Sequence, residues 1–497
     1  MSIGAFQILG IALTVALILC AGLLGSRRVR SADDFINASG RCGCWVVVGS
    51  IMGSLVSGQA TVGTAQLAFR YGLSAIWFTF GCAIGCAILG LGYAAPLCRR
   101  GSLTLMEVVA TEYGKSAETI GSLFTSIGIF LSVIAQILSS VALLISVFSI
   151  GTLPAALLAA SVMALYVVTG GSLGTGLGGI VKLILLYVSS IAACIVATYV
   201  GGSLMPALSD TLVGQPLGAL LNIDGSEALR ARFFNPVARG INTDVGSVLS
   251  LTLGIVSTQT YAQAIWSAKS DSVARKAAMI AALLTPPIGL SCTFVGLFMR
   301  TRCLTTEEAT ALLAMGSTLP ESTLILSSSA QVFPMFIIHF MPPLLSGITL
   351  GTLLITNVAG GAGLSLGTAT ILARDLYFRF SSRAFSGPEK LRRTRIILLL
   401  VLGAAALTAA FVPQAIINDF GFLSMGLRSA GVFLPISCAL FLPGRIHPRL
   451  ALAAILCGPI AVLLAKILGL SLDPLFCGMG TAAICMLAGL RRGKPAL

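Results

Sequence analysis

Met52-Gly-Ser-Leu-Val-Ser-Gly-Gln-Ala-Thr-Val-Gly63 is the stretch from which the fold can be predicted. It places helix-breaking residues in the middle of an apolar span from Cys44 to about Phe69. Glycine loses more backbone freedom than other residues in a helix, and hydroxyl side chains compete for backbone hydrogen bonds. A helix that unwinds at membrane depth exposes N–H and C=O groups, which is tolerated where they face a cavity, an ion or a solute. The stretch therefore predicts half of a transport site. The alternative is a face of small residues for close helix packing.

The composition indicates a polytopic membrane protein. Of the 497 residues, 56% are hydrophobic and 10% are charged, and the mean hydropathy is +0.99. The net charge of +14 does not indicate nucleic-acid binding, because the basic residues occupy short loops and form no continuous stripe. The 13 cysteines and two histidines show neither metal-ligand spacing nor a catalytic constellation. We therefore expect no enzyme, no metal site and no cofactor other than a coupling ion, Na⁺ or H⁺.

Windows of about twenty apolar residues predict an all-α protein with about thirteen transmembrane helices. Two expected spans are too long for one straight crossing, so each should tilt or extend beyond the bilayer. Two long loops, 204–245 and 301–333, are expected to form short external helices or gates. The spans lie at 5–25, 45–68, 72–97, 118–150, 152–169, 178–203, 246–268, 277–299, 336–373, 395–413, 420–442, 449–469 and 473–490.

The distribution of basic residues predicts the orientation. If the loop after the first span is cytoplasmic, alternate loops collect most of the 31 basic residues, among them Arg27, Arg28, the cluster from Arg374 to Arg395 and the tail Arg491-Arg-Gly-Lys494. Cytoplasmic loops are enriched in lysine and arginine. We therefore expect an integral protein of the cell (inner) membrane with its N-terminus outside and its C-terminus in the cytoplasm.

The span 246–268 repeats the anomaly of the first stretch. Its apolar sequence is interrupted by Gly254-Ile-Val-Ser-Thr-Gln-Thr-Tyr261, which carries hydroxyls and an amide. Interrupted helices at the start of each of two five-span halves are typical of inverted-repeat transporters whose site lies at mid-membrane. The sequence therefore predicts two broken helices facing one cavity.

Several segments resemble landmarks of the solute:sodium symporter family. They are Ser31-Ala-Asp-Asp-Phe-Ile-Asn-Ala-Ser-Gly40, Arg100-Gly-Ser-Leu-Thr-Leu-Met-Glu107 with Glu112-Tyr-Gly114, Thr169-Gly-Gly171, Ser267-Ala-Lys-Ser270 and Thr368-Ala-Thr-Ile-Leu-Ala-Arg-Asp-Leu-Tyr377. The resemblance covers most of the chain and implies the leucine-transporter type of 5+5 inverted repeat.

That resemblance divides the chain into five parts. A leading helix and cytoplasmic loop (1–43) precede the first repeat (44–203), and an external loop (204–245) leads to the second repeat (246–442), which contains the loop 301–333. Two peripheral helices and a basic tail follow (443–497).

The resemblance also implies a sodium site, from which this chain departs. Members take main-chain carbonyls from the first broken helix, here at Gly53 and Val56, and hydroxyls from the eighth core helix. Counting back from the last landmark gives Thr356-Asn-Val-Ala-Gly360, which lacks both hydroxyls. The acidic position of the fifth core helix is Gly179, and Lys182 follows it by one helical turn. Lys182 is therefore expected to replace the ion, as a lysine does in sodium-independent transporters of this fold, or to carry a proton.

The charges inside the spans point to the substrate. All 17 acidic residues fall in loops or at span ends, whereas Lys182, Arg428 and Lys466 lie within spans. A buried charge at membrane depth costs about 3 kcal/mol and normally faces a partner or a cavity. Lys466 is expected to reach the interface. We infer an anionic substrate, most simply a small carboxylate, with Arg428 as its ligand. The alternative is that Arg428 binds exposed carbonyls of a broken helix and holds the structure.

The expected function is secondary active transport of this small solute by alternating access. Sodium coupling follows from the resemblance, and proton coupling, exchange or ion-independent transport are the alternatives. A sensor on a transporter scaffold and a proton-pumping respiratory subunit are further alternatives; the latter would need intramembrane acids. Candidate substrate contacts, besides Arg428, are Ser54, Ser57, Gln59, Gln136, Gly254, Ser257, Thr258 and Gln259. For Gln136 a helix-to-helix hydrogen bond is an equal alternative.

Overall fold

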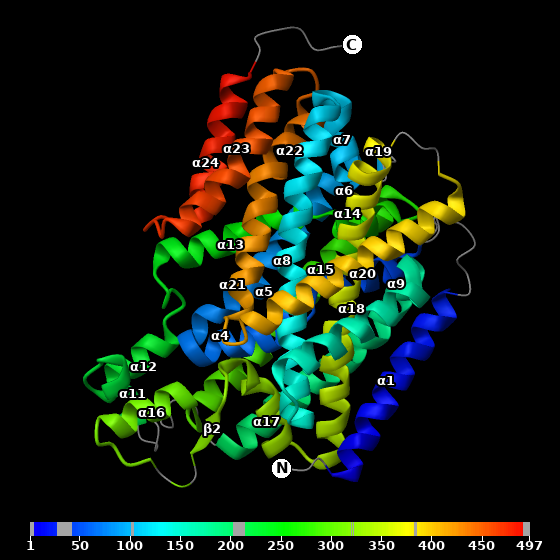
Figure 1. Cartoon of the computed structure of the whole chain (residues 1–497). Coiled ribbons are helices and arrows are strands. Elements are labelled where there is room, and N and C mark those ends of the chain that lie inside the picture. Colours follow the sequence, from blue (N-terminus) through cyan, green and yellow to red (C-terminus); the bar gives the residue numbers. More distant parts are fainter. Residues whose placement is uncertain are drawn as a thin grey trace.

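The computed structural model describes residues 4–26, 42–100, 104–201, 214–319, 321, 323–381 and 385–490. Side chains of 18, 19, 21–26, 168–178, 214–216 and 226 are not described. The landmark 31–40, Arg27, Arg28 and the tail 491–497 therefore lie outside the described residues, as do the side chains of the landmark 169–171. Within the described part the protein is almost entirely helical, and the predicted all-α class is confirmed (Figure 1).

The first half begins with the predicted broken helix. After α1 (Ala5–Ser26), α3 (Cys44–Leu55) ends at Val56, whose φ of −86° and ψ of 91° are extended. The chain resumes at the π-helical turn η2 (Gln59–Gly63) and continues into α4 (Thr64–Tyr71). The break therefore falls at residues 56–58, inside the stretch that predicted it.

Four further helical stretches complete the first half. The turn η3 (Gly72–Ile76) leads into α5 (Trp77–Ile88), which continues through η4 (Leu89–Tyr93) into α6 (Ala94–Arg100). The short α7 (Leu105–Tyr113) precedes α8 (Lys115–Phe148). The expected spans 152–169 and 178–203 both fall within the element α9 (Thr152–Gly201).

The second half repeats the pattern. It opens with α13 (Ile241–Val256), a break at Ser257-Thr258, and α14 (Gln259–Trp266), followed by α15 (Asp271–Arg300). The expected span 336–373 is two helices, α17 (Val332–Phe340) and α18 (Pro343–Ile371), because the sequence Met341-Pro-Pro343 ends the first. The remaining elements are η6 (Leu372–Tyr377), α19 (Phe378–Phe380), α20 (Gly387–Phe411), α21 (Ile417–Arg428), η7 (Ser429–Phe433) and α22 (Leu434–Phe441), then α23 (Pro448–Ile467) and α24 (Pro474–Ala488).

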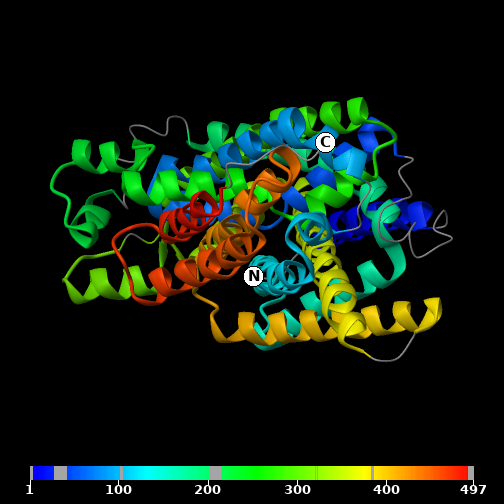
Figure 2. The same cartoon turned by 90° about the horizontal axis from the view of Figure 1, so that it is seen from above.

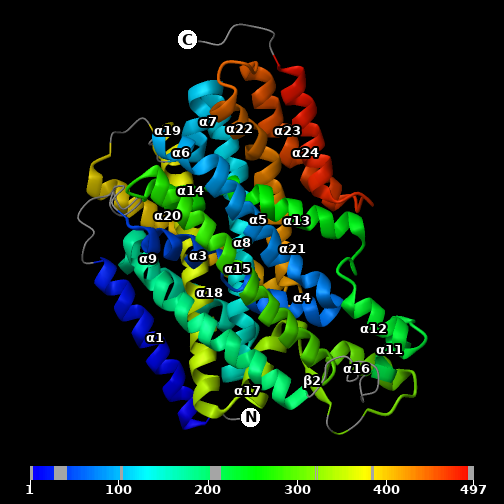
Figure 3. The same cartoon turned by 180° about the vertical axis from the view of Figure 1, so that it is seen from behind.

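Helices from both halves interleave around α8. Helix α8 packs against α18 and α21, and α13 packs against α5 (Figures 1 and 2). Helix α1 lies along α9 and α18 at one edge, as the view from behind in Figure 3 shows. Among the described residues, 8 helices are long and apolar enough to cross a membrane, with shorter apolar helices between them. The protein is an integral membrane protein.

The long loops gather on one side of the bundle, opposite α7 and α19 (Figure 1). The loop 204–245 contains α11 (Gly214–Leu221) and α12 (Ser226–Phe234), and the loop 301–333 contains α16 (Thr306–Ala314), η5 (Ser329–Gln331) and the parallel strands β1 (Cys303–Thr305) and β2 (Leu324–Leu326). They share one apolar cluster, Leu217, Leu229, Phe233, Leu297, Leu304, Ala309 and Leu312. We call this the α16 side and the opposite one the α7 side.

A bidentate ion pair fixes the α16 loop to the bundle. Arg300 donates from Nη1 and Nη2 to the two carboxylate oxygens of Glu308, both at 2.9 Å, and the Arg300 side chain is only 2% exposed. Burial raises the pKa of Glu308, but the hydrogen bond and charge of Arg300 outweigh it and hold the pKa below its ordinary value.

Glu308→Gln should therefore destabilise the protein by about 2–3 kcal/mol, because it leaves a buried guanidinium without its counter-charge. The pKa of Glu308 is lowered on folding, so its stabilisation is present above the unfolded pKa of about 4.3 and is lost as pH falls through the folded value. Thermal unfolding of the purified protein measured from pH 3 to 7 should show this acid-side loss in the parent and less of it in the variant. The exposed neighbour in Glu307→Gln is the control; equal effects of the two would contradict the assignment.

Candidate functional site

The first break is held by Gln136 of α8. Its Oε1 accepts a hydrogen bond from the Gly58 N–H at 2.8 Å, and its Nε2 donates to Ser57 Oγ at 2.7 Å. A Cβ at Gly58 would collide with Ser139 of α8, so α8 approaches the unwound backbone closely. Gln136 thus makes the helix-to-helix bonds that the sequence left as an alternative, and it makes them to the unwound segment itself.

Lys182 of α9 reaches the same break. Its Nζ donates to the Gly53 carbonyl at 2.7 Å and to the Thr356 carbonyl of α18 at 3.4 Å, and the residue is 1% exposed. Gly179 permits this approach, because a Cβ there would collide with the Gly49 carbonyl of α3. The ammonium therefore joins α3 to α18. Of its two partners, the Gly53 carbonyl belongs to the predicted ion site as such, whereas Thr356 was predicted there without its carbonyl being named.

The α18 segment opposite the break is closely packed. Gly360 faces Ser57, and a Cβ at Gly360 would lie 3.3 Å from Ser57 Oγ and closer still to its Cβ. Ala359 is 8% exposed and Thr356 is fully buried. Position 360 therefore has to be glycine for Ser57 to pack this closely. A serine at position 360 would collide with Ser57. Val56, the other predicted carbonyl ligand, lies in the break itself.

The second break is occupied by Arg428 at the end of α21. Its Nη1 donates to Thr258 Oγ1 at 2.7 Å, and Thr258 Oγ1 donates to the Gly254 carbonyl at 2.6 Å. Its Nη2 donates to Ser424 Oγ at 2.8 Å and to Ser132 Oγ of α8 at 3.3 Å, and its Nε donates to the Ser424 carbonyl at 3.1 Å. The guanidinium is completely buried. All these partners are uncharged.

Three other predicted residues lie differently. Gln259 turns to the α7 side, where its Oε1 accepts from the Leu105 N–H at 2.8 Å. Ser257 Oγ donates to the Leu253 carbonyl of its own helix at 2.9 Å. Ser54 faces Gly363 of α18, where a Cβ would lie 3.2 Å from its Oγ. The structure therefore brings Ser57, Gln136 and Lys182 together at the first break, and Gly254, Thr258 and Arg428 at the second.

Gln59 lies between the break and α21. It is 5% exposed, and its Nε2 has no hydrogen-bond partner within the described residues. A Cβ at Gly421 of α21 would lie 3.0 Å from that nitrogen. One turn earlier on α21, Asn418 is fully buried, and both polar atoms of its amide are also unpartnered there. The Gln59 amide nitrogen and both polar atoms of the Asn418 amide are therefore unpaired donors and an unpaired acceptor near the contact between the first break and α21.

Sequence reasoning missed polar residues of α8, α18 and α21 near the two breaks. Asn357 Nδ2 donates to Ser139 Oγ at 2.8 Å, and Ser132 and Ser424 share a 2.7 Å hydrogen bond beside Arg428. The available signal was their helical spacing, since Ser132, Gln136 and Ser139 fall on one face of an otherwise apolar helix.

Hydrogen bonds join the two halves on each side of the bundle. On the α16 side, Gln66 of α4 accepts from the Ile417 N–H at 2.9 Å and donates to Ser329 Oγ at 3.0 Å. On the α7 side, the Cys42 N–H donates to the Ser267 carbonyl at 2.9 Å, and the Lys269 N–H donates to the Cys42 carbonyl at 3.1 Å. Lys182 and Arg428 are themselves buried, with 1% and 0% of their surface exposed.

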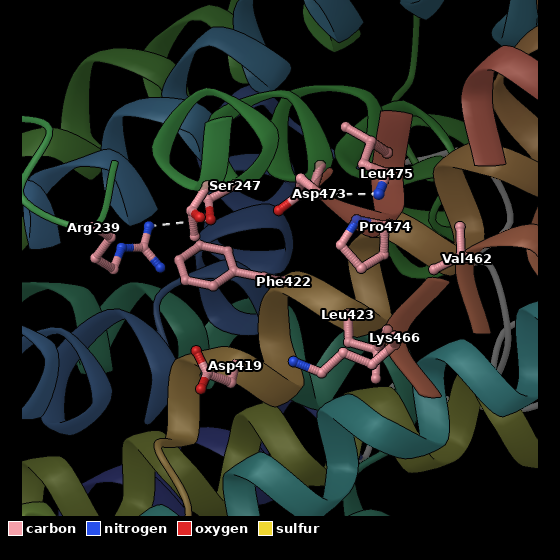
Figure 4. A pocket seen from close by; sticks show the side chains of 13 residues that line it. Arg239, Ser247, Asp419, Phe422, Leu423, Val462, Lys466, Asp473, Pro474 and Leu475 are labelled. Carbon is pink, nitrogen blue, oxygen red and sulfur yellow. Dashed lines mark hydrogen bonds between the residues drawn. The ribbon is translucent and has the colours of Figure 1, made fainter. Parts of the chain in front are cut away.

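Lys466 is exposed in the last turn of α23, as a side chain that reaches the interface would be. It also lines a pocket together with Asp419, Arg239 and Asp473 (Figure 4). This pocket lies where α13, α21 and α24 begin and α23 ends.

Membrane proteins that are almost entirely helical and have two interleaved halves, each opening on a broken helix, are typically transporters that work by alternating access to a central site. Comparison with known proteins agrees with that class. The sequence profile of the sodium:solute symporter family matches residues 35–458, and the chain belongs to this family. It is a transporter and not an enzyme.

One solved structure supports the fold, and two others are similar to a lesser extent. A Na⁺-coupled sialic acid symporter in a substrate-bound outward-open state superposes with a TM-score of 0.74 at 17% identity, over 98% of this chain and 97% of that chain. Mhp1, a nucleobase-cation-symport-1 family transporter in a closed conformation, gives 0.47 at 10% identity, over 91% and 92%. A manganese transporter from Eremococcus coleocola gives 0.46 at 13% identity, over 93% and 97%.

The contact between Gly360 and Ser57 can be tested by filling it. Gly360→Ala should lower the stability by about 1–3 kcal/mol, because overpacking forces backbone and side-chain shifts. Gly367→Ala on the same helix is the matched control: its Cβ would meet only Thr260 Cγ2 at 3.8 Å, and alanine is the better helix residue. Thermal unfolding should show a loss only for Gly360→Ala; an equal tolerance of both changes would mean that the close approach is absent.

Proposed function

We propose that this protein is a secondary transporter that moves a small organic anion without a sodium ion at the first break, because the Lys182 ammonium takes the place of that ion. The observation that carries the proposal is the position of Nζ, 2.7 Å from the Gly53 carbonyl and 3.4 Å from the Thr356 carbonyl. A primary ammonium and a sodium ion both carry one positive charge and bind carbonyl oxygens. The methyl group of Ala359 and the hydrogen of Gly360 supply no further ligands for an ion.

The anionic nature of the substrate follows from the uncompensated charge. Lys182 is bonded to carbonyls, and Arg428 to hydroxyls, a carbonyl and the Met425 thioether. No acidic side chain pairs with either of them in the part of the chain that the structure describes. Buried charges without a counter-charge are costly. A carboxylate that enters the site would supply it.

The polar groups around the breaks suit such a solute. Buried atoms without a hydrogen-bond partner among the described residues include Gln59 Nε2, the Asn418 amide, Thr260 Oγ1, Thr356 Oγ1 and Asn357 Oδ1. Leaving a buried polar group unsatisfied costs about 1–3 kcal/mol. A small carboxylate bearing further hydrogen-bonding groups would satisfy several of these atoms together.

Transport measurements distinguish the alternative functions, which are sodium symport, proton-coupled transport and sensing without transport. We place the α16 side outside the cell and the α7 side in the cytoplasm, as the basic loops predict. Proton coupling would make transport follow a pH gradient, sodium symport would follow a sodium gradient, and a sensor would transport nothing. Uptake by reconstituted vesicles under each gradient distinguishes the three.

Lys182→Ala should abolish uptake into proteoliposomes, whereas the parent should transport at the same rate with and without sodium. Because the substitution leaves the Gly53 and Thr356 carbonyls without their cation, added sodium should raise the melting temperature of the variant and not that of the parent. Lys390→Ala, in the exposed first turn of α20, serves as the control with unchanged transport. Strict sodium dependence of the parent would refute the proposed replacement.

Arg428→Gln should remove the response to carboxylates. In thermal-shift measurements with acetate, lactate and pyruvate, we expect at least one to stabilise the parent, and the affinity of the variant to fall by about tenfold or more, since a charge-assisted bond is lost. Arg428→Lys retains the positive charge but loses the two parallel N–H donors of the guanidinium. Its affinity for the carboxylate should therefore lie between those of the parent and Arg428→Gln. If Arg428→Gln lowers only the melting temperature of the ligand-free protein and keeps the ligand response, Arg428 has a purely structural role.

A further inference from the structure

A mixed-charge pocket lies apart from the broken helices, where α13, α21 and α24 begin and α23 ends. Its cavity volume is about 90 Å³, and it is lined by Arg239, Asp419, Lys466 and Asp473 together with apolar side chains such as Phe422 and Leu423. In Figure 4 the Lys466 amino group points toward the Asp419 carboxylate on one side of Phe422, while Arg239 and Asp473 lie on the other.

Two of the four charged residues, Arg239 and Asp473, already have hydrogen-bond partners within the protein. Arg239 pairs with Asp244 at 2.7 Å, donates to Ser247 Oγ at 3.1 Å and lies 4.8 Å over the Phe422 ring. Asp473 Oδ1 accepts from the Leu475 N–H at 3.0 Å and so caps the start of α24. These contacts fix the walls of the pocket.

Lys466 and Asp419 are the other two charged residues of the pocket. Both are exposed, and neither has a hydrogen bond or an ion pair within 4.0 Å in the described part of the chain. The apolar surface between them comes from Phe422, Leu423 and Val462. One positive and one negative group thus face a common space with an apolar floor.

From this arrangement we infer that the pocket binds a zwitterion, namely an amino acid whose carboxylate meets Lys466, whose ammonium meets Asp419 and whose apolar side chain lies against Phe422. A ligand with only one charge would satisfy one group and be repelled by the other, and such repulsion is how a site discriminates between related ligands. An amino acid carries both charges, on groups bonded to one α-carbon.

The wall of the pocket packs toward the first break. Phe422, which forms its wall, packs against Phe78 with ring centroids 5.6 Å apart. Phe78 and Gln59 both approach Gly421, the residue next to Phe422. A ligand in this pocket is therefore separated from the first break by one aromatic layer.

The inference does not depend on the proposed transport function, because it is tested by equilibrium binding. Leucine, 4-methylpentanoate (leucine without its ammonium) and 3-methylbutylamine (leucine without its carboxylate) would be titrated into the purified full-length protein by calorimetry. Leucine should bind about tenfold more tightly than either single-charge analogue. Equal binding of leucine and 4-methylpentanoate, or no binding of leucine, would overturn the inference.

Charge variants provide the sharper test. Lys466→Met should weaken leucine and shift the preference to 3-methylbutylamine, whereas Asp419→Asn should shift it to 4-methylpentanoate. The swap of Asp419→Lys with Lys466→Asp restores one charge of each sign and should bind leucine better than either single variant. Lys390→Met, on a distant helix, is the control. If leucine binding is unaffected by these changes but lost in Arg428→Gln, the amino acid binds at the broken helices and this pocket is not its site.

Discussion

The ammonium group of Lys182 lies between the carbonyls of Gly53 and Thr356, and the geometry of the first broken helix depends on it. Unwinding at residues 56–58 releases carbonyls from the helix, and at membrane depth they need a donor or a cation. The neighbouring Gln136 satisfies the N–H of Gly58 and the hydroxyl of Ser57, but as an amide it supplies no charge. Lys182 supplies both the donor and the charge.

Arg428 has the corresponding place in the second half. Lys182 lies on the fifth core helix; it binds the broken helix of its own repeat, α3, and the third helix of the other repeat, α18. Arg428 lies on the tenth core helix; it binds the broken helix of its own repeat at Thr258, and the third helix of the other repeat, α8, at Ser132. The two cations therefore obey the inverted-repeat symmetry. They differ in their partners: carbonyls surround the ammonium, and hydroxyls surround most of the guanidinium.

Sequence reasoning could predict the fold and both breaks, because these follow from local chemistry. Glycine and hydroxyl residues inside an apolar span mark an unwound helix wherever the rest of the chain lies, and Pro342-Pro343 explains why one long span became two helices. Lys182 and Arg428 were identifiable because charges at membrane depth are rare. The partners of Arg428 on α8 and α21, Ser132 and Ser424, were not, because which side chain faces a neighbouring helix depends on how the helices rotate about their axes. Gln259, which turned to Leu105, is the example.

The same contacts constrain how the site can open. Each cation joins helices of both repeats, so any rocking of α3 and α14 against α8 and α18 must stretch its bonds. The Lys182 contact with Gly53 is shorter than that with Thr356, 2.7 Å against 3.4 Å, so the second is the weaker and should part first. Lys182 would then stay with the broken helix as α18 moves away. In the proposed mechanism the ammonium is a permanent ligand of the unwound carbonyls, and only the anionic solute, held near Arg428, has to enter and leave.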